Sequence, residues 1–293
     1  MTAVTDRGVS MSTAKCAAKF VTVLALAGVA FAAGESRKDL HFKVGKHPAI
    51  SINNPYGPVV VKAGAPHEVI INAILHSDKV EIDQSQSHNR IDIISHLLQG
   101  ADQYSGVVEY QVLVPADASL SIHSENGPVH AENLHGDLAL EGGNGAMEVL
   151  NCGDGHVHVR TLNGPVTISN VRNGHVEVVS MSGDVSLTSV SGPYVAVNSN
   201  TGKIEYAGDF GGEGEYSFTS YAGNIEAVAP AYASIDVTAR SSQGRVDSDF
   251  SLEPKHTPFY AKAGSYFSGT LGKAASSVKL MSFSGKIHLK KRQ

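Results

Sequence analysis

Between residues 127 and 206, apolar and polar residues alternate in short runs that recur every 18 or 19 positions. Each run follows a glycine, as in Gly164-Pro-Val-Thr-Ile168 and Gly183-Asp-Val-Ser-Leu187. The glycines that precede the runs are Gly127, Gly145, Gly164, Gly183 and Gly202, and a second series lies halfway between them at Gly136, Gly155 and Gly174. Alternation over four or five residues is typical of a short strand, and a fixed period of such strands predicts a β-solenoid.

The alternation also predicts which side chains form the core. Side chains of a strand alternate between its two faces, so the apolar positions point inward and Glu148, Thr167, Ser186 and Glu177 point outward. When the units are aligned on their glycines, the apolar residues form columns: Val129, Met147, Val166, Val185 and Ile204; Val149, Ile168, Leu187 and Tyr206; Leu134, Cys152, Val171 and Val190. Cys152 is therefore expected to be a small buried hydrophobic residue.

Glycine suits the turns between these strands because it adopts positive φ without steric cost. The Asn-Gly pairs, such as Asn144-Gly145 and Asn163-Gly164, would also suit two-residue hairpin turns. We favour coils, because hairpins would not keep one residue type in register every 19 positions. The predicted fold is all-β: a β-solenoid, similar to a parallel β-helix, with coils of about 19–21 residues.

The solenoid pattern divides the chain into regions. Residues 38–115 contain strand-like runs without the glycine period, and we interpret them as an irregular N-terminal β cap, with a separate small sandwich as the alternative. Residues 116–250 form the regular coils. Residues 251–293 are interrupted C-terminal coils, in which Gly285-Lys-Ile-His-Leu289 is expected to close the array. Residues 38–293 are thus predicted to be one β-solenoid domain.

The N-terminal residues have a different character. Lys15 and Lys19 precede an apolar run, residues 20–31, and Ala30-Phe31-Ala32 fits a cleavage site, so residues 1–33 are predicted to be a secretory signal peptide. Met11 is an alternative start. The run is too short to span a membrane. We therefore expect an exported protein of the periplasm, cell envelope or extracellular space, with no transmembrane anchor after signal cleavage.

Charge and polar composition narrow the range of functions. With 23 Lys and Arg against 28 Asp and Glu, the formal net charge is −5. The chain therefore lacks the excess of basic residues that is typical of a nucleic-acid-binding protein. Outward positions of residues 127–206 are mainly Ser, Thr, Asn and Ala with scattered Glu, whereas glycan cleavage needs paired carboxylates. We expect no catalytic residues, no cofactor and no enzymatic activity.

One polar cluster has the composition of a metal site. His156 and His158 alternate on one strand, and His175 and Glu177 occupy the same two positions one coil later, at a distance of about 4.8 Å. Imidazoles and a carboxylate at this spacing could bind Zn²⁺. An exposed polar ladder in a chain with 14 histidines accounts for the same residues. We prefer this second interpretation and assign no metal.

Aromatic residues crowd the C-terminal third of the chain. If exposed, they would form a platform for a sugar or a protein, and if buried, they would fill wider coils. We favour burial, since Tyr206 continues an inward column. The residues concerned are Tyr194, Tyr206, Tyr216, Phe218, Tyr221, Tyr232, Phe259, Tyr260, Tyr266 and Phe267.

Several segments in a particular order resemble a known family. They are Asn54-Pro-Tyr-Gly57-Pro-Val-Val-Val61, Val114-Pro115, the serial Asn/Ser-x-x-Gly-x-Val units, Ala229–Val237, and Ser242-Gln-Gly-Arg-Val246. Together they resemble the bacterial putative-adhesin domain family of unknown function, over about residues 40–293. The resemblance implies a β-solenoid-like fold in an exported or envelope protein, and it offers no catalytic residues to carry over.

These observations lead to one expected function and one alternative. We expect an exported, non-catalytic structural or adhesion module of the bacterial cell envelope that presents flat β faces for binding. Its partner is unidentified, with a cell-surface glycan or an envelope protein as candidates. The alternative is a β-helical carbohydrate-active enzyme that acts on an envelope or extracellular polysaccharide, and a pocket lined by two or more carboxylates would favour it.

Overall fold

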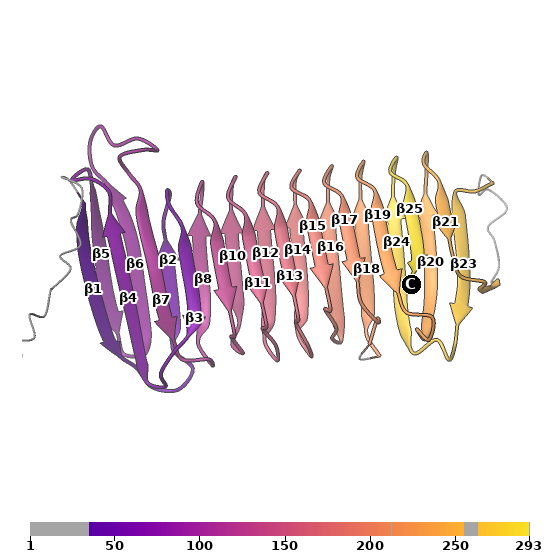
Figure 1. The fold of residues 1–293 in the computed structure, drawn as a ribbon, viewed down its shortest axis with the longest axis horizontal. Coiled ribbons are helices and arrows are strands. Elements are labelled where there is room, and N and C mark those ends of the chain that lie inside the picture. The colour runs from indigo at the N-terminus through magenta and orange to yellow at the C-terminus, as the bar shows by residue number, and fades with distance from the viewer. Residues whose placement is uncertain (1–34, 212, 255–262, 293) are drawn as a thin grey trace, which may run out of the picture. The chain divides into compact units, whose positions relative to one another are not determined.

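A computed structural model describes residues 35–211, 213–254 and 263–292 of the chain. The predicted signal peptide, residues 1–33, lies outside these ranges. Ala33–Gln293 forms one compact unit, and its described secondary structure consists of strands in two facing sheets of 12 and 13 strands, here called sheet 1 and sheet 2 (Figure 1). The predicted β-solenoid is confirmed. None of the described residues belongs to a helix with the length and apolarity that a membrane span requires.

Each regular coil contributes one strand to each sheet. Sheet 1 contains β9 (Val129–Glu132), β11 (Met147–Leu150), β13 (Val166–Ser169), β15 (Val185–Thr188), β17 (Ile204–Ala207) and β19 (Ile225–Ala229). Sheet 2 contains β8 (Ser119–Ser124), β10 (Leu138–Gly142), β12 (His156–Thr161), β14 (His175–Ser180), β16 (Tyr194–Ser199) and β18 (Glu215–Ser220). Successive strands pair in parallel, with Val166 opposite Val185 and Val176 opposite Val195, so the hairpin interpretation of the Asn-Gly pairs is wrong.

The core consists of the predicted inward columns. Ile168, Val178 and Leu187 have no exposed surface, and the other residues of those columns are almost as inaccessible. Of the outward residues, Glu148 and Thr167 are exposed as expected, whereas Glu177 and Ser186 are half-buried.

Cys152 lies in one of the buried columns, as expected, with 4% of its surface exposed. The thiol donates a hydrogen bond to the carbonyl oxygen of Leu150, at 3.4 Å. Burial raises the pKa of the thiol, so the reactive thiolate is disfavoured. Its environment is that of a core residue rather than of a nucleophile.

The turn glycines are required for a different reason from the one expected. Positive φ among the described glycines is confined to Gly57, Gly100, Gly264 and Gly272. The left-handed turn positions are occupied instead by residues with φ between 53° and 61°: Asn133, Asn151, Asn170 and Ser189. Each main-series glycine instead lies against the backbone of the glycine one coil before it. A Cβ at Gly183 would overlap the carbonyl oxygen of Gly164.

A column of buried hydroxyl groups supports the same turns. Ser180 Oγ donates to the carbonyl oxygen of Gly183 at 2.6 Å, and Ser199 Oγ donates to that of Gly202 at 3.0 Å. Equivalent bonds to the glycine three residues later are made by Ser124 and Thr161. The repeated Ser-x-x-Gly units therefore supply a partner for a backbone group that has been removed from water.

The solenoid begins earlier than the glycine period suggests. β2 (Ala49–Asn53) is parallel to β8, and β3 (Val59–Ala63) is parallel to β9, so residues 49–63 form a coil. β6 (Arg90–Leu97) and β7 (Val108–Val114) form a further coil outside it. Antiparallel strands follow: β4 (Glu68–Leu75) and β1 (Ser36–Lys43) in sheet 1, and β5 (Val80–Ser87) in sheet 2. The N-terminal region is thus continuous with both sheets, and its outermost strands carry many charged and polar residues, which protects an open edge.

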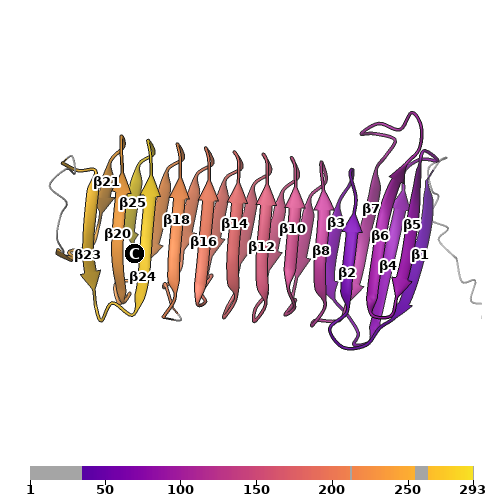
Figure 2. The same ribbon diagram turned by 180° about the vertical axis from the view of Figure 1, so that it is seen from behind.

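At the C-terminal end, the order of coils in space differs from their order in the sequence (Figure 2). β24 (Ser276–Ser282) lies between β18 and β20 (Ile235–Ser241), and β25 (Ile287–Lys291) lies between β19 and β21 (Val246–Ser248). The expectation that Gly285–Leu289 closes the array is therefore wrong. β23 (Tyr266–Leu271) pairs antiparallel with β20 and is followed at the edge of sheet 2 by β22 (Glu253–Pro254).

The aromatic residues are divided between core and surface. Tyr206, Phe210, Tyr216 and Phe218 form a buried cluster that fills the coil where the period lengthens. Tyr206 donates to the carbonyl oxygen of Val190 at 3.0 Å. The expectation of burial is wrong for Tyr221 and Tyr232, which are exposed. Phe259 and Tyr260 lie outside the described residues.

Substitution of a main-series glycine tests the stacking constraint. Gly183→Ala places a methyl group on the carbonyl of Gly164, and because the backbone fixes the position of the Cβ and the carbonyl is itself backbone, the strain cannot be relieved by a rotamer change. We expect a loss of at least about 3 kcal/mol in the free energy of unfolding, measured by urea denaturation. Gly174→Ala is the control, since its Cβ would meet Val171 Cγ1 at 3.0 Å, and it should lose no more than about 1 kcal/mol. Equal effects would contradict the constraint.

Removal of one buried hydroxyl tests the column below the turn. Ser180→Ala leaves the carbonyl of Gly183 without its partner, and we expect a loss of about 1–3 kcal/mol in the free energy of unfolding. Ser186→Ala, which removes an outward hydroxyl, should stay within about 0.5 kcal/mol of the wild type. The two variants can be compared in one chemical denaturation series. A Ser180→Ala protein as stable as Ser186→Ala would rule out the role assigned to this hydroxyl.

Candidate binding groove

The outer face of sheet 1 carries charges that neutralise one another. Lys62 Nζ lies 2.9 Å from Glu132 Oε2, and His130 Nδ1 lies 2.8 Å from Glu148 Oε2. A hydrogen bond from Lys62, and a weaker one from His130, lower the pKa of Glu132. This face therefore presents few charged groups that still need a partner.

The two carboxylates of sheet 1 that come closest to a catalytic pair are also neutralised. Glu205 and Glu226 lie opposite one another on β17 and β19. Lys203 bonds Glu205, and Lys290 Nζ donates to Glu226 at 2.7 Å. The hydrogen bond from Lys290 lowers the pKa of Glu226, which is the opposite of what a general acid requires.

The histidine cluster predicted from the sequence separates into pairs. His156 turns toward the preceding coil, where its Nδ1 lies 3.1 Å from Asp137 Oδ1, and His158 Nδ1 lies 3.4 Å from Glu177 Oε2. The ring of His175 packs between those of His156 and Tyr194, with centroids 5.1 and 4.6 Å away. In the part of the chain that the structure describes, no three His, Cys, Asp or Glu side chains are arranged to hold a metal ion.

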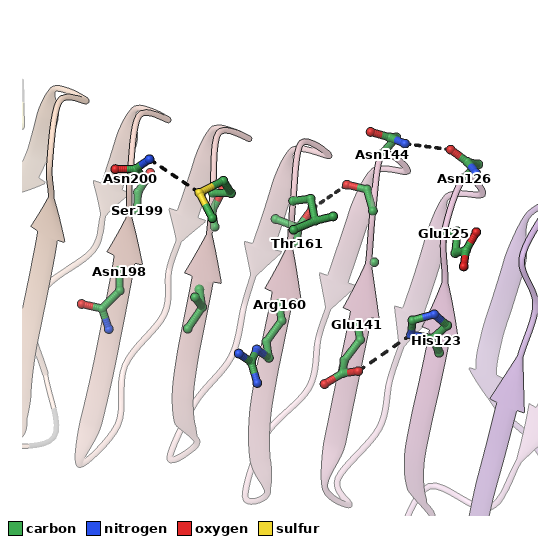
Figure 3. Close-up of a pocket in the computed structure, with 16 residues that line it drawn as sticks. His123, Glu125, Asn126, Glu141, Asn144, Arg160, Thr161, Asn198, Ser199 and Asn200 are labelled. Carbon is green, nitrogen blue, oxygen red and sulfur yellow. Dashed lines mark hydrogen bonds and ion pairs between the residues drawn. The ribbon is translucent and has the colours of Figure 1, made fainter.

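A groove follows the outer face of sheet 2 where its strands end (Figure 3). Its volume is about 850 Å³. The floor is one outward column, a residue from each of β8, β10, β12, β14 and β16: His123, Glu141, Arg160, Val179 and Asn198. Adjacent strands are separated by about 4.8 Å, so the floor is roughly 19 Å long.

The turns that follow these strands form one wall of the groove. Asn144 Nδ2 donates to Asn126 Oδ1 at 2.8 Å, and Asn163 Nδ2 donates to Asn144 Oδ1 at 2.7 Å. These bonds fix the amide orientation and leave each Asn with a second N–H for another partner. Beside this ladder, Leu162 and Met181 are exposed at 55% and 53%.

The apolar part of the wall continues beyond the groove. Tyr221 and Phe283 occupy the same turn position as Leu162 and Met181 on later coils, since each follows a residue of the buried hydroxyl column. Their rings stack with centroids 4.9 Å apart and an angle of 6° between the planes. Both side chains are exposed, Tyr221 at 59% and Phe283 at 39%.

The groove floor contains a cation without a partner. Arg160 is exposed, and it makes no hydrogen bond or ion pair with any residue that the structure describes. On the two preceding strands, His123 Nδ1 and Glu141 Oε2 lie 3.8 Å apart. Glu125 is a second carboxylate at that end. The groove thus combines an acidic end, a central guanidinium and an amide and apolar wall.

The sequence interpretation did not identify this groove. Its residues show the same 19-residue spacing as the core, as in Asn144 and Asn163 or Leu162 and Met181. They lie at turns and strand ends, where side-chain direction does not follow from strand alternation. The Asn-Gly pairs, which recur in the alignment of the units on their glycines, are the signal for the Asn ladder, but the sequence interpretation treats them only as turn residues.

The pH dependence of stability tests the neutralised face. The pKa of Glu226 in the folded protein is lowered from an ordinary value of 4.5, so the unfolded state binds more protons in acid. Stability contributed by Glu226 is therefore present above the unfolded pKa and lost as pH falls through the folded pKa. Between about pH 6 and pH 3, wild type should lose more free energy of unfolding than Glu226→Gln or Lys290→Met. Equal losses in all three proteins, measured by urea denaturation, would contradict this assignment.

Comparisons with known proteins place the chain in a family. Two solved structures align with it: a putative cell adhesion protein from Clostridium sporogenes (14% identity, TM-score 0.30, 88% of this chain and 100% of that one) and a putative adhesin from Bacteroides fragilis (13% identity, TM-score 0.46, 88% and 97%). A search of curated proteins finds no match. The family model Toastrack DUF4097 matches residues 47–290, most of the chain, and this confirms the resemblance seen in the sequence. The chain belongs to the Toastrack DUF4097 family.

Proposed function

We propose that the protein is an exported, non-catalytic adhesion module of the bacterial cell envelope, and that it binds its partner in the groove on sheet 2. The observation that carries this proposal is the contrast between the two outer faces. Sheet 1 pairs its charges internally, whereas the groove holds an unpaired guanidinium, amides with free N–H groups and exposed apolar side chains. Polar and apolar groups that converge in a concavity are typical of a binding site.

The partner that fits this surface best is a cell-surface glycan. The strands of the groove floor already have a neighbour on each side, so a peptide cannot extend sheet 2 there by backbone hydrogen bonds. Recognition must therefore use side chains. Amides and a guanidinium are suited to hydroxyl groups and acidic substituents of a sugar chain.

The structure also supports non-catalytic binding over cleavage. Every Asp or Glu with a clearly shifted pKa in the described residues has that pKa lowered by hydrogen bonds or positive charges: Asp102, Glu132, Asp137, Glu226, Asp247 and Asp249. A general acid for glycoside cleavage needs a pKa raised by burial or by a neighbouring carboxylate. The architecture provides neither environment for these groups.

One observation favours the alternative, a carbohydrate-active enzyme. Glu125 and Glu141 both line the groove, and a pocket with two carboxylates is the feature expected of such an enzyme. Both are exposed in an open groove, and Glu141 is in addition close to His123.

Filling the groove tests the proposed binding surface. Val179→Trp places an indole on the groove floor, and Thr167→Trp places the same side chain on the outer face of sheet 1 as a matched control. In cosedimentation with purified peptidoglycan sacculi and bacterial exopolysaccharide, we expect wild type and Thr167→Trp to bind at least one of these glycans. Val179→Trp should bind that glycan at least about tenfold more weakly.

The same samples distinguish the competing functions. If Val179→Trp binds as wild type does, the groove is not the binding surface, and if no protein binds either glycan, the adhesion proposal is wrong. Release of reducing ends from the glycan that is lost in Glu141→Gln would establish the enzyme alternative. Fractionation of cells expressing the full chain tests export, since protein retained in the cytoplasm would contradict it.

A further inference from the structure

We propose that the groove on sheet 2 recognises an extended glycan that carries isolated carboxylate groups, with Arg160 as the residue that pairs with a carboxylate. This inference rests on the proposed function and deepens it by naming the chemical class of the ligand. Three features of the groove support it: one unpaired cation, two hydrogen-bonded amides on successive coils, and an apolar wall that two aromatic rings continue beyond the groove.

The first feature is the electrostatic position of Arg160. It lies midway along the floor, with Glu141 on one side and uncharged Val179 and Asn198 on the other. The guanidinium offers five N–H donors in a plane that matches a carboxylate in a bidentate pair. No described residue uses these donors. A ligand carboxylate that lies over Arg160 therefore meets guanidinium N–H donors that no described residue uses.

The second feature is the repeat along the groove. The groove-lining amides of Asn126 and Asn144 lie on successive coils, about 4.8 Å apart, which is comparable to the length of one sugar unit in an extended chain, and Asn163 continues the ladder just outside the groove. Each amide is oriented by its neighbour and retains one N–H. Over these two coils, an extended glycan parallel to the floor would thus meet one hydrogen-bond donor per unit without rearrangement of the protein.

The third feature is the apolar wall. Leu162 and Met181 border the groove, and the stacked rings of Tyr221 and Phe283 continue their column beyond Asn200. The faces of a sugar ring carry C–H groups that pack on aromatic and aliphatic surface. A chain leaving the groove at its C-terminal end would pass directly over these rings.

The distribution of charge favours isolated carboxylates over a densely charged polymer. Glu125 and Glu141 occupy one end of the groove, and Arg160 is the only unpaired cation among its described lining residues. A polymer with a phosphate on every unit would place negative charge beside these glutamates. A glycan with one carboxylate per disaccharide can place that group at Arg160 and an uncharged sugar beside Glu141 on the adjacent coil.

A matched pair of glycans tests the carboxylate. Short hyaluronan oligosaccharides carry one carboxylate per disaccharide, and reduction of those carboxylates to alcohols gives the same chain without charge. By titration calorimetry, we expect wild type to bind the acidic chain about five- to tenfold more tightly than the reduced chain. Arg160→Gln should bind both chains with the affinity that wild type has for the reduced one.

Two control variants separate this effect from net charge and from stacking. Arg172→Gln removes the same charge from an exposed turn at the other end of the strands and should keep the preference for the acidic chain. Tyr221→Ala should weaken binding of both chains by a similar factor. Rates of thermal unfolding and circular dichroism, measured for all variants, check that each is folded.

The possible results distinguish this inference from the proposed function. Equal binding of the acidic and reduced chains, with loss of both in Val179→Trp, would overturn the carboxylate inference and leave glycan binding in the groove intact. Tighter binding of a glycerol phosphate polymer than of hyaluronan would also overturn it. Absence of binding to all of these glycans, together with absence of binding to sacculi, would overturn both proposals.

Discussion

The close approach of successive turns is the constraint on which the rest of this structure depends. At the main-series turns, one glycine lies against the carbonyl of the glycine before it, so that a Cβ would overlap the backbone below. Hydrogen bonding between parallel strands sets the separation of the coils, and the turns can follow this spacing only without a Cβ at these positions. Because the backbone can approach in only one register, the apolar side chains that follow each glycine fall into columns, and a shift of one residue would expose all of them.

The same contact explains why polar residues also form columns. Once the register is set, the serine or threonine three residues before each glycine comes to the same buried position, where its hydroxyl bonds the turn backbone. Outside the turn, Asn144 bonds Asn126 on the coil before it, and Asn163 bonds Asn144 in the same way. A side chain of the wrong size at a turn would therefore disturb the core, the hydroxyl column and the amide ladder together.

The difference between the two outer faces arises from the residues that occupy equivalent outward positions. On sheet 1, lysines and histidines lie beside glutamates on adjacent coils, and the charges cancel. On sheet 2, the equivalent column runs from Glu141 through Arg160 to Val179 and Asn198, so the guanidinium has an aliphatic neighbour on one side. A regular scaffold can thus carry a distinct surface on one face, because outward residues are free of the packing requirement that governs the core.

The sequence by itself determined the β-solenoid, the period of its coils and the buried columns, because these depend on local alternation and on a repeat that can be counted. It also placed Cys152 and Tyr206 in the core correctly. It assigned the turn glycines a positive φ that the structure shows at Asn133 and Asn170 instead, since the need for a missing Cβ arises only when a second coil lies against the first. Only the tertiary structure placed β24 and β25 between coils that precede them in sequence and brought Arg160 into a groove beside the turns. Strand pairing across long separations and the direction of turn side chains are decided by contacts between coils, which a periodic pattern along one chain does not contain.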